Sequence, residues 1–60
     1  MRLLTIVIPV LDEAAIIVAS LQALAPLRAR GVEIIVVDGG SRDGTPRLAE
    51  PLADRVIAGP

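Results

Sequence analysis

The residues most clearly able to form a ligand-binding site are Asp38 and the two glycines that follow it, Gly39 and Gly40. They come directly after Ile34–Val37, an apolar and mostly β-branched run that is typical of a buried strand. In open α/β sheets, ligands bind just beyond the carboxyl ends of the strands. A carboxylate there can accept hydrogen bonds from a ligand, and glycines let the ligand approach the backbone. The pattern therefore indicates a site for a nucleotide-type ligand.

A second group of candidate residues follows an earlier apolar run. Leu3–Ile8 is typical of a strand, and Pro9 is expected to end it because proline has no N–H for a sheet hydrogen bond. Asp12 is expected to cap the helix that follows, with Glu13 in its first turn, where an acid complements the helix dipole. Simpler interpretations stay open: Glu13 as a surface acid, and Asp38 as the start of an Asx turn into the glycines.

The loop after the two glycines has a structural pattern of its own. Ser41 and Asp43 are expected to accept hydrogen bonds from backbone amides of the loop. Thr45 would cap the next helix with its hydroxyl, and Pro46 suits the first helical position because its ring presets the backbone angle. This segment is therefore expected to be a turn followed by a helix.

These residues must be positioned by alternating strands and helices. The expected elements are a strand over 3–8, a helix from 13 that Pro26 ends or kinks, a strand over 33–37, a helix from 46 to 49 or 52, and a strand over 54–58. Ile17, Leu21 and Leu24 share one face of the first helix and should be core. The order β-α-β-α-β predicts an α/β fold with a parallel, Rossmann-like sheet.

One face of this sheet is expected to be bare. Right-handed crossovers place both helices on the same face. The first two strands, however, are apolar at nearly every position, which is typical of strands covered on both faces. The 60 residues are therefore interpreted as an incomplete domain. The exposed sheet edge leaves open a non-catalytic alternative, a segment that associates with another chain through its strands.

The composition excludes several kinds of site. The chain has no Cys, His, Phe, Tyr or Trp, so it offers no disulfide, imidazole base or aromatic stacking platform. Six Arg against seven Asp and Glu give a net charge of −1 at pH 7, without the basic patch that nucleic acid requires. No apolar run approaches the roughly 20 residues of a membrane span. We expect a cytoplasmic segment that binds no nucleic acid and crosses no membrane.

Two motifs taken together resemble the opening of glycosyltransferase family 2. Residues 6–13 (IVIPVLDE) are similar to the family's first strand with Pro-x-x-Asn-Glu, and residues 36–45 (VVDGGSRDGT) to its Val-Asp-Asp/Gly-Gly/Asn-Ser-x-Asp-Gly-Thr pattern. The resemblance covers essentially all of residues 1–60, which would form the N-terminal part of a GT-A catalytic domain. The chain differs at Leu11, where many relatives have an aromatic residue, at Gly39, where many have a second acid, and at Asp12, where Asn is commoner.

The resemblance implies a nucleoside diphosphate sugar as donor and leaves the acceptor unidentified. The residues that it places against the donor are Pro9, Val10, Leu11, Glu13, Asp38, Gly39 and Gly40. The first three would line the base pocket, Glu13 would lie near the ribose, and Asp38 would accept a hydrogen bond from the base or the ribose.

The resemblance also implies a divalent cation, Mg²⁺ or Mn²⁺, bound through an Asp-x-Asp motif on a later strand. The 60 residues contain neither that motif nor the family's general base. None of them is therefore expected to be a catalytic residue or a metal ligand, and the chain alone is expected to be inactive.

Another α/β nucleotide-binding module, nucleotidyltransferase-like or receiver-like, is the alternative within the same fold class. A dinucleotide-binding domain is disfavoured because no Gly-x-Gly-x-x-Gly follows the first strand, and a Walker phosphate loop is absent. Nucleotidyltransferases usually carry a loop rich in glycine and basic residues after that strand. Here Pro9–Glu13 occupies that position, which disfavours them.

Overall fold

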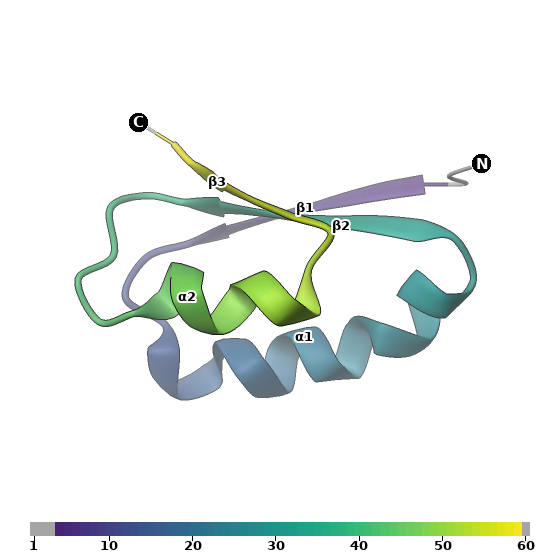
Figure 1. The fold of residues 1–60 in the computed structure, drawn as a ribbon, viewed down its shortest axis with the longest axis horizontal. Helices are drawn as coiled ribbons and strands as arrows, with labels where there is room; N and C mark the ends of the chain where they lie inside the picture. Colours follow the sequence, from purple (N-terminus) through teal and green to yellow (C-terminus); the bar gives the residue numbers. More distant parts are fainter. Residues whose placement is uncertain (1–3, 60) are drawn as a thin grey trace.

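The computed structural model describes residues 4–59 and contains the five predicted elements in the predicted order (Figure 1). Their bounds are β1 (Leu4–Val10), α1 (Ala14–Ala29), β2 (Val32–Asp38), α2 (Thr45–Ala49) with a following 3₁₀ turn η1 (Glu50–Leu52), and β3 (Arg55–Ala58). Leu3, the predicted first residue of the first strand, lies outside the described residues. The prediction of a β-α-β-α-β unit is confirmed.

The three strands form one parallel sheet in the order β1-β2-β3, with β2 in the centre. Val10 pairs with Asp38, and Asp38 pairs with Ala58. The carboxyl ends of all three strands therefore meet at one edge of the sheet. The α/β fold with a parallel sheet is confirmed.

Both helices lie on the same face of the sheet, as right-handed crossovers require (Figure 1). Alternate residues of β2 point toward them and are buried, from Val32 to Asp38. The α1 stripe supplies the facing side chains: Ile17 and Leu21 are each 1% exposed, and Leu24 packs against them. Burial of these aliphatic side chains is the main force that holds the layers together.

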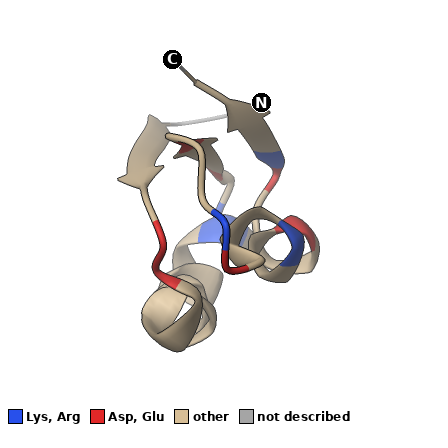
Figure 2. Ribbon diagram, turned by 90° about the vertical axis from the view of Figure 1, so that its left-hand side faces the viewer, with Lys and Arg blue, Asp and Glu red and all other residues tan. Residues whose placement is uncertain are grey.

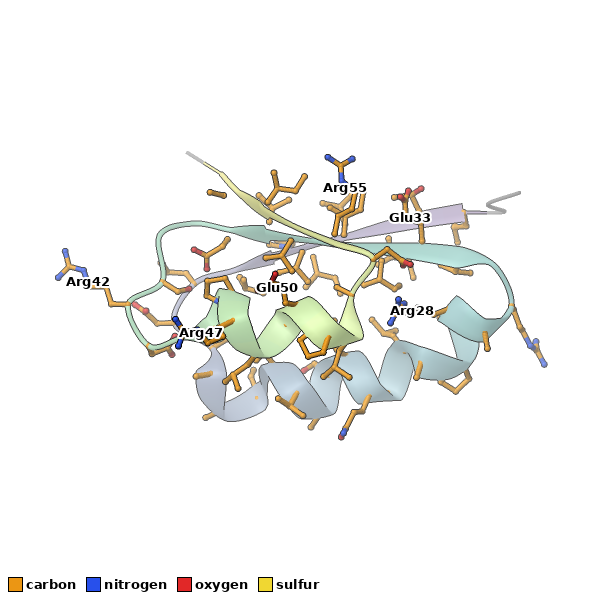
Figure 3. All side chains as sticks on the ribbon, in the orientation of Figure 1. Arg28, Glu33, Arg42, Arg47, Glu50 and Arg55 are labelled. Atoms are coloured by element: carbon orange, nitrogen blue, oxygen red, sulfur yellow. The ribbon has the colours of Figure 1, made fainter. Side chains whose placement is uncertain are left out.

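Among the described residues nothing covers the opposite face of the sheet, as the right-handed crossovers predicted. Val7 in β1 is 57% exposed and Ile57 in β3 is 38% exposed, although both are apolar. Glu33 and Arg55 also project from this face, away from the helices (Figure 3). The structure is thus a two-layer unit in which only one face of the sheet is packed.

Pro9 does not end β1, which continues to Val10, so the predicted strand end is wrong. The Val10 carbonyl oxygen accepts a hydrogen bond from Gly39 N–H at 2.9 Å, on the side of β2. Successive residues of a strand turn their backbone groups to opposite sides, so the Pro9 nitrogen faces away from β2. Among the described strands β1 has no other neighbour, and proline is tolerated at such a position because no ladder hydrogen bond is lost.

Pro26 does not end α1 either, since the helix continues to Ala29. Its ring leaves the Gln22 carbonyl without its helical donor. Both residues are exposed, so water can bind that carbonyl. The helix stops before Gly31, whose φ of 97° lies in the left-handed region that favours glycine.

Candidate functional site

The two predicted donor-binding segments lie side by side at the carboxyl ends of β1 and β2. Gly39 N–H donates to the Val10 carbonyl oxygen at 2.9 Å, directly beyond the paired residues Val10 and Asp38. A Cβ atom at Gly39 would lie 3.5 Å from that oxygen, an ordinary contact. Gly40 is different, because its φ of 105° is a conformation that residues with side chains rarely adopt. Figure 2 looks at this edge and shows acidic residues in both loops.

Asp38 is buried, and its carboxylate is held by its own loop. Oδ2 accepts hydrogen bonds from the N–H groups of Gly40 and Ser41, each at 3.0 Å, and Oδ1 accepts one from the Ser41 hydroxyl. The side chain thus makes the Asx-type turn that was the simpler interpretation. A carboxylate has about four acceptor positions, so one position on Oδ1 is left for a ligand.

These hydrogen bonds keep Asp38 ionised. The bond from the Ser41 hydroxyl is the largest influence and lowers the pKa of Asp38 below the ordinary 3.8, assisted by the Ser41 and Gly40 amides. Burial and the nearby Asp43 carboxylate act in the opposite direction without overcoming them. At neutral pH Asp38 is therefore a charged acceptor of hydrogen bonds.

Three successive amides at the start of α1 are bound by side chains of the β2–α2 loop. Asp12 N–H donates to Ser41 Oγ at 2.8 Å, Glu13 N–H to Thr45 Oγ1 at 2.9 Å, and Ala14 N–H to Asp43 Oδ2 at 3.0 Å. The two loops are thereby joined by hydrogen bonds between residues about 30 positions apart.

The prediction that Asp12 caps α1 is wrong. Glu13 is the cap residue, without a side-chain hydrogen bond, and the capping groups come from the other loop. Asp12 instead accepts a hydrogen bond from Arg42 N–H on its Oδ1, at 2.7 Å. Its φ of 50° is left-handed, a conformation that Asp and Asn tolerate better than most residues.

Asp43 and Thr45 form the other half of this connection. Asp43 Oδ1 accepts hydrogen bonds from the Thr45 N–H and hydroxyl, and the hydroxyl bond is the largest cause of the lowered pKa of Asp43. The prediction that Ser41 and Asp43 bind amides of their own loop is confirmed for Asp43, which binds the Thr45 amide, whereas the Ser41 hydroxyl binds the Asp12 amide of the other loop. The prediction for Thr45 is wrong: Gly44 is the cap of α2, and the Thr45 hydroxyl, fully buried, joins Asp43 to Glu13.

This arrangement affects where a diphosphate could bind. The N-terminus of a helix often holds phosphate groups through unbonded N–H groups. At α1 the amides of Glu13 and Ala14 already have protein partners, and the Asp43 carboxylate lies beside them. The α1 N-terminus therefore presents a negative group where the dinucleotide-binding fold presents free amides.

Asp38 also lines an open cleft of about 360 Å³ beneath β3. The cleft runs between α2 with η1 and the end of β3, and it is lined by Asp38, Pro46, Arg47, Glu50, Val56, Ile57 and Ala58. From the sequence, neither Arg47 nor Glu50 was assigned to a site. Their spacing of three positions puts them on one side of the continuous turn formed by α2 and η1, which is the signal that could have identified them.

The other predicted donor residues do not line this cleft. Val10 is buried, Glu13 is half-buried, and the remaining four, Pro9, Leu11, Gly39 and Gly40, are exposed at the ends of β1 and β2. Asp38 is therefore the residue at which the paired strand ends and the cleft meet.

Residues 4–59 contain no group of three or more His, Cys, Asp or Glu that could hold a metal ion. The described residues thus do not by themselves fit the Mg²⁺ or Mn²⁺ site that the resemblance implies. Within the same range, no helix has the length and apolar character to cross a membrane.

Residues 5–59 match the sequence model described as glycosyl transferase family 2. The match covers both motifs and all five elements, and it favours that family over the nucleotidyltransferase-like alternative. Searches of curated proteins and of solved structures gave no significant match.

Proposed function

Because the chain belongs to glycosyltransferase family 2, we propose that the paired ends of β1 and β2 bind the nucleoside part of a nucleoside diphosphate sugar. The donor would serve sugar transfer to an acceptor, the reaction of the family. The observation that carries the proposal is the direct contact of the two motifs, Gly39 N–H to the Val10 carbonyl oxygen. Val10 and Asp38, which are 28 positions apart along the chain, are paired where α/β folds bind ligands.

Each predicted residue has a role that suits its position. Pro9 and Leu11, which are exposed, provide apolar contact for the base, and the buried Val10 supports them through the bond between its carbonyl oxygen and Gly39. Glu13, the cap residue of α1, would accept a hydrogen bond from a ribose hydroxyl. Asp38 supplies the charged acceptor, with one position on Oδ1 left for an N–H or O–H of the ligand. A charge-assisted hydrogen bond of this kind is roughly twice as strong as a neutral one.

We further propose that the 60 residues bind donor without transferring the sugar. No Asp-x-Asp sequence occurs in the chain. Mg²⁺ or Mn²⁺ would be held by residues other than those described, together with the diphosphate oxygens. Turnover of a nucleotide sugar by the 60-residue chain, in an assay of hydrolysis or transfer, would contradict this part of the proposal.

Calorimetric titration with uridine diphosphate and guanosine diphosphate tests the binding proposal. Asp38→Asn keeps the size of the side chain and removes its charge, and we expect affinity to fall about tenfold or more, as when a charge-assisted bond becomes neutral. Asp54→Asn is the matched control, because Asp54 lies at the other end of the sheet between Arg28 and Ile34. If the wild-type chain binds neither nucleotide, or if both variants lose affinity equally while folded, the proposal is wrong.

A further inference from the structure

We infer that Ser41 is a positioning residue that couples the β1–α1 loop to the Asp38 carboxylate, so that the two donor-binding segments act as one unit. The inference rests on the proposed function. Ser41 Oγ accepts a hydrogen bond from Asp12 N–H at 2.8 Å and donates one to Asp38 Oδ1. One hydroxyl thus connects the backbone of the first motif to the charged group of the second.

The two hydrogen bonds fix the direction of the hydroxyl. A serine hydroxyl has one proton and two acceptor positions. Its proton is given to Asp38, and one of its acceptor positions is taken by the Asp12 amide. The Ser41 N–H also binds Asp38, on Oδ2, so both carboxylate oxygens contact this residue. The remaining acceptor position of Oδ1 therefore has a fixed direction relative to the β1–α1 loop.

The other hydrogen bonds between the two loops have a different structural role. Thr45 and Asp43 bind the amides of Glu13 and Ala14 and hold the start of α1. Their side chains are joined to each other by the Thr45 hydroxyl. Removal of the Ser41 hydroxyl leaves these bonds in place. A Ser41 variant therefore separates the coupling of the donor segments from the general attachment of the loops.

The charged groups around Asp38 make the coupling measurable. Asp43 lies on the same loop and raises the pKa of Asp38, while Arg47 and Glu50 line the same cleft as Asp38. The Ser41 hydroxyl bond is the largest influence that lowers that pKa. Nucleotide binding that needs ionised Asp38 is lost as the pH falls through its pKa. Without the hydroxyl, this loss occurs at a higher pH.

The test uses Ser41→Ala and Ser41→Thr, with Ser20→Ala on the exposed side of α1 as the control. Uridine diphosphate and guanosine diphosphate are titrated by calorimetry across acidic to neutral pH. We expect Ser41→Ala to bind about tenfold more weakly at pH 7, the size of effect of one lost bond to a charged group. Its pH midpoint should rise, Ser41→Thr should recover most of the affinity, and Ser20→Ala should match the wild type.

Equal affinity and an equal pH midpoint in folded Ser41→Ala would overturn the inference and leave the proposed function intact. If the wild-type chain binds neither nucleotide, the proposed function fails instead. If Ser41→Ala does not fold, hydrogen exchange of the wild-type Asp12 amide replaces it. Saturating nucleotide should slow the exchange of the Asp12 amide several-fold. If a nucleotide binds and the exchange rate of this amide does not change, the coupling is overturned.

Discussion

An aspartate connects separate elements at each end of the sheet, but the two aspartates have different partners. At the amino end, Asp54 bridges Arg28 in the last turn of α1, at 3.2 Å and 3.3 Å, and the Ile34 amide in β2, at 2.7 Å. At the carboxyl end, Asp43 accepts from the Ala14 amide and from Thr45. One carboxylate is neutralised by a guanidinium, whereas the other is held by neutral donors.

The difference separates a structural end of the sheet, the amino end, from the proposed binding end, the carboxyl end. The amino end closes α1 onto the sheet with an ion pair whose Asp54 side chain is 12% exposed. The carboxyl end uses hydrogen bonds to keep two carboxylates ionised, Asp38 and Asp43, since their donors lower both pKa values. Negative charge with an open acceptor position is available only where no cation is paired with it. This difference supports the proposal that a polar ligand binds at the carboxyl end.

The largest effect on stability is expected from Asp54→Ala. The substitution leaves the Ile34 amide and the Arg28 guanidinium without this partner, which should lower the free energy of unfolding by about 2–3 kcal/mol. Chemical denaturation measures the loss. Nucleotide affinity of the folded molecules should stay within twofold of the wild type. A large loss of nucleotide affinity in folded Asp54→Ala would contradict the assignment of a structural role to the amino end and of binding to the carboxyl end.

Thr45→Val should have the next largest effect, at the binding end. Valine has nearly the same shape as the buried Thr45 but leaves the half-buried Glu13 amide without an acceptor, at a cost of about 1–2 kcal/mol. Thr45→Ser keeps the hydroxyl and should recover most of this free energy in the same denaturation experiment. If Thr45→Val and Thr45→Ser have the same free energy of unfolding, the hydrogen bonds between the two loops do not hold the loops together.

Acid should loosen the binding end through its lowered pKa values. Asp38 and Asp43 have pKa values below 3.8 in the folded chain, so their contribution to stability is fully present above pH 3.8 and is lost as the pH falls through the lower folded values. NMR titration of the Gly40 and Ala14 amides, which these carboxylates bind, follows the change. Midpoints at or above 3.8 would contradict the hydrogen-bond geometry.

The smallest effect is expected from Asp12→Asn. Asparagine tolerates the left-handed φ of 50° and keeps an acceptor for Arg42 N–H, so stability should change by less than about 0.5 kcal/mol. Asp12→Ala loses both advantages and should cost about 1–2 kcal/mol by denaturation. A large loss in Asp12→Asn would mean that the charge of Asp12, and not its conformation, supports the loop.

The strands, the α1 stripe and the bare face could be predicted because they depend on local patterns. Apolar runs at Ile34–Val37 and the spacing of Ile17 and Leu21 determine which side chains can be buried. The capping of α1 could not be predicted, because its donors and acceptors are about 30 residues apart and meet only in the folded sheet. The prediction for Pro9 was wrong because proline is tolerated where its nitrogen faces the side of a strand that has no neighbouring strand, and the sequence does not reveal that side.

The candidate site could likewise be predicted only where it depends on a local pattern. Asp38 and the glycines follow from their position at a strand end, which the sequence alone reveals. The cleft that includes Arg47 and Glu50 depends on how α2 and η1 pack beneath β3, a tertiary contact without a local signal beyond their spacing. The Asx-type turn and the ligand role of Asp38 proved to be compatible, because the turn leaves one acceptor position on the carboxylate.

Mapping of amide chemical shifts during titration with uridine diphosphate or guanosine diphosphate tests the central claim most directly. The account predicts that the largest changes occur at Leu11, Glu13, Gly39 and Gly40, while the Ile34 and Asp54 amides at the other end of the sheet change little. Changes centred on the Arg28–Asp54 end, or no change with either nucleotide at millimolar concentration, would contradict it.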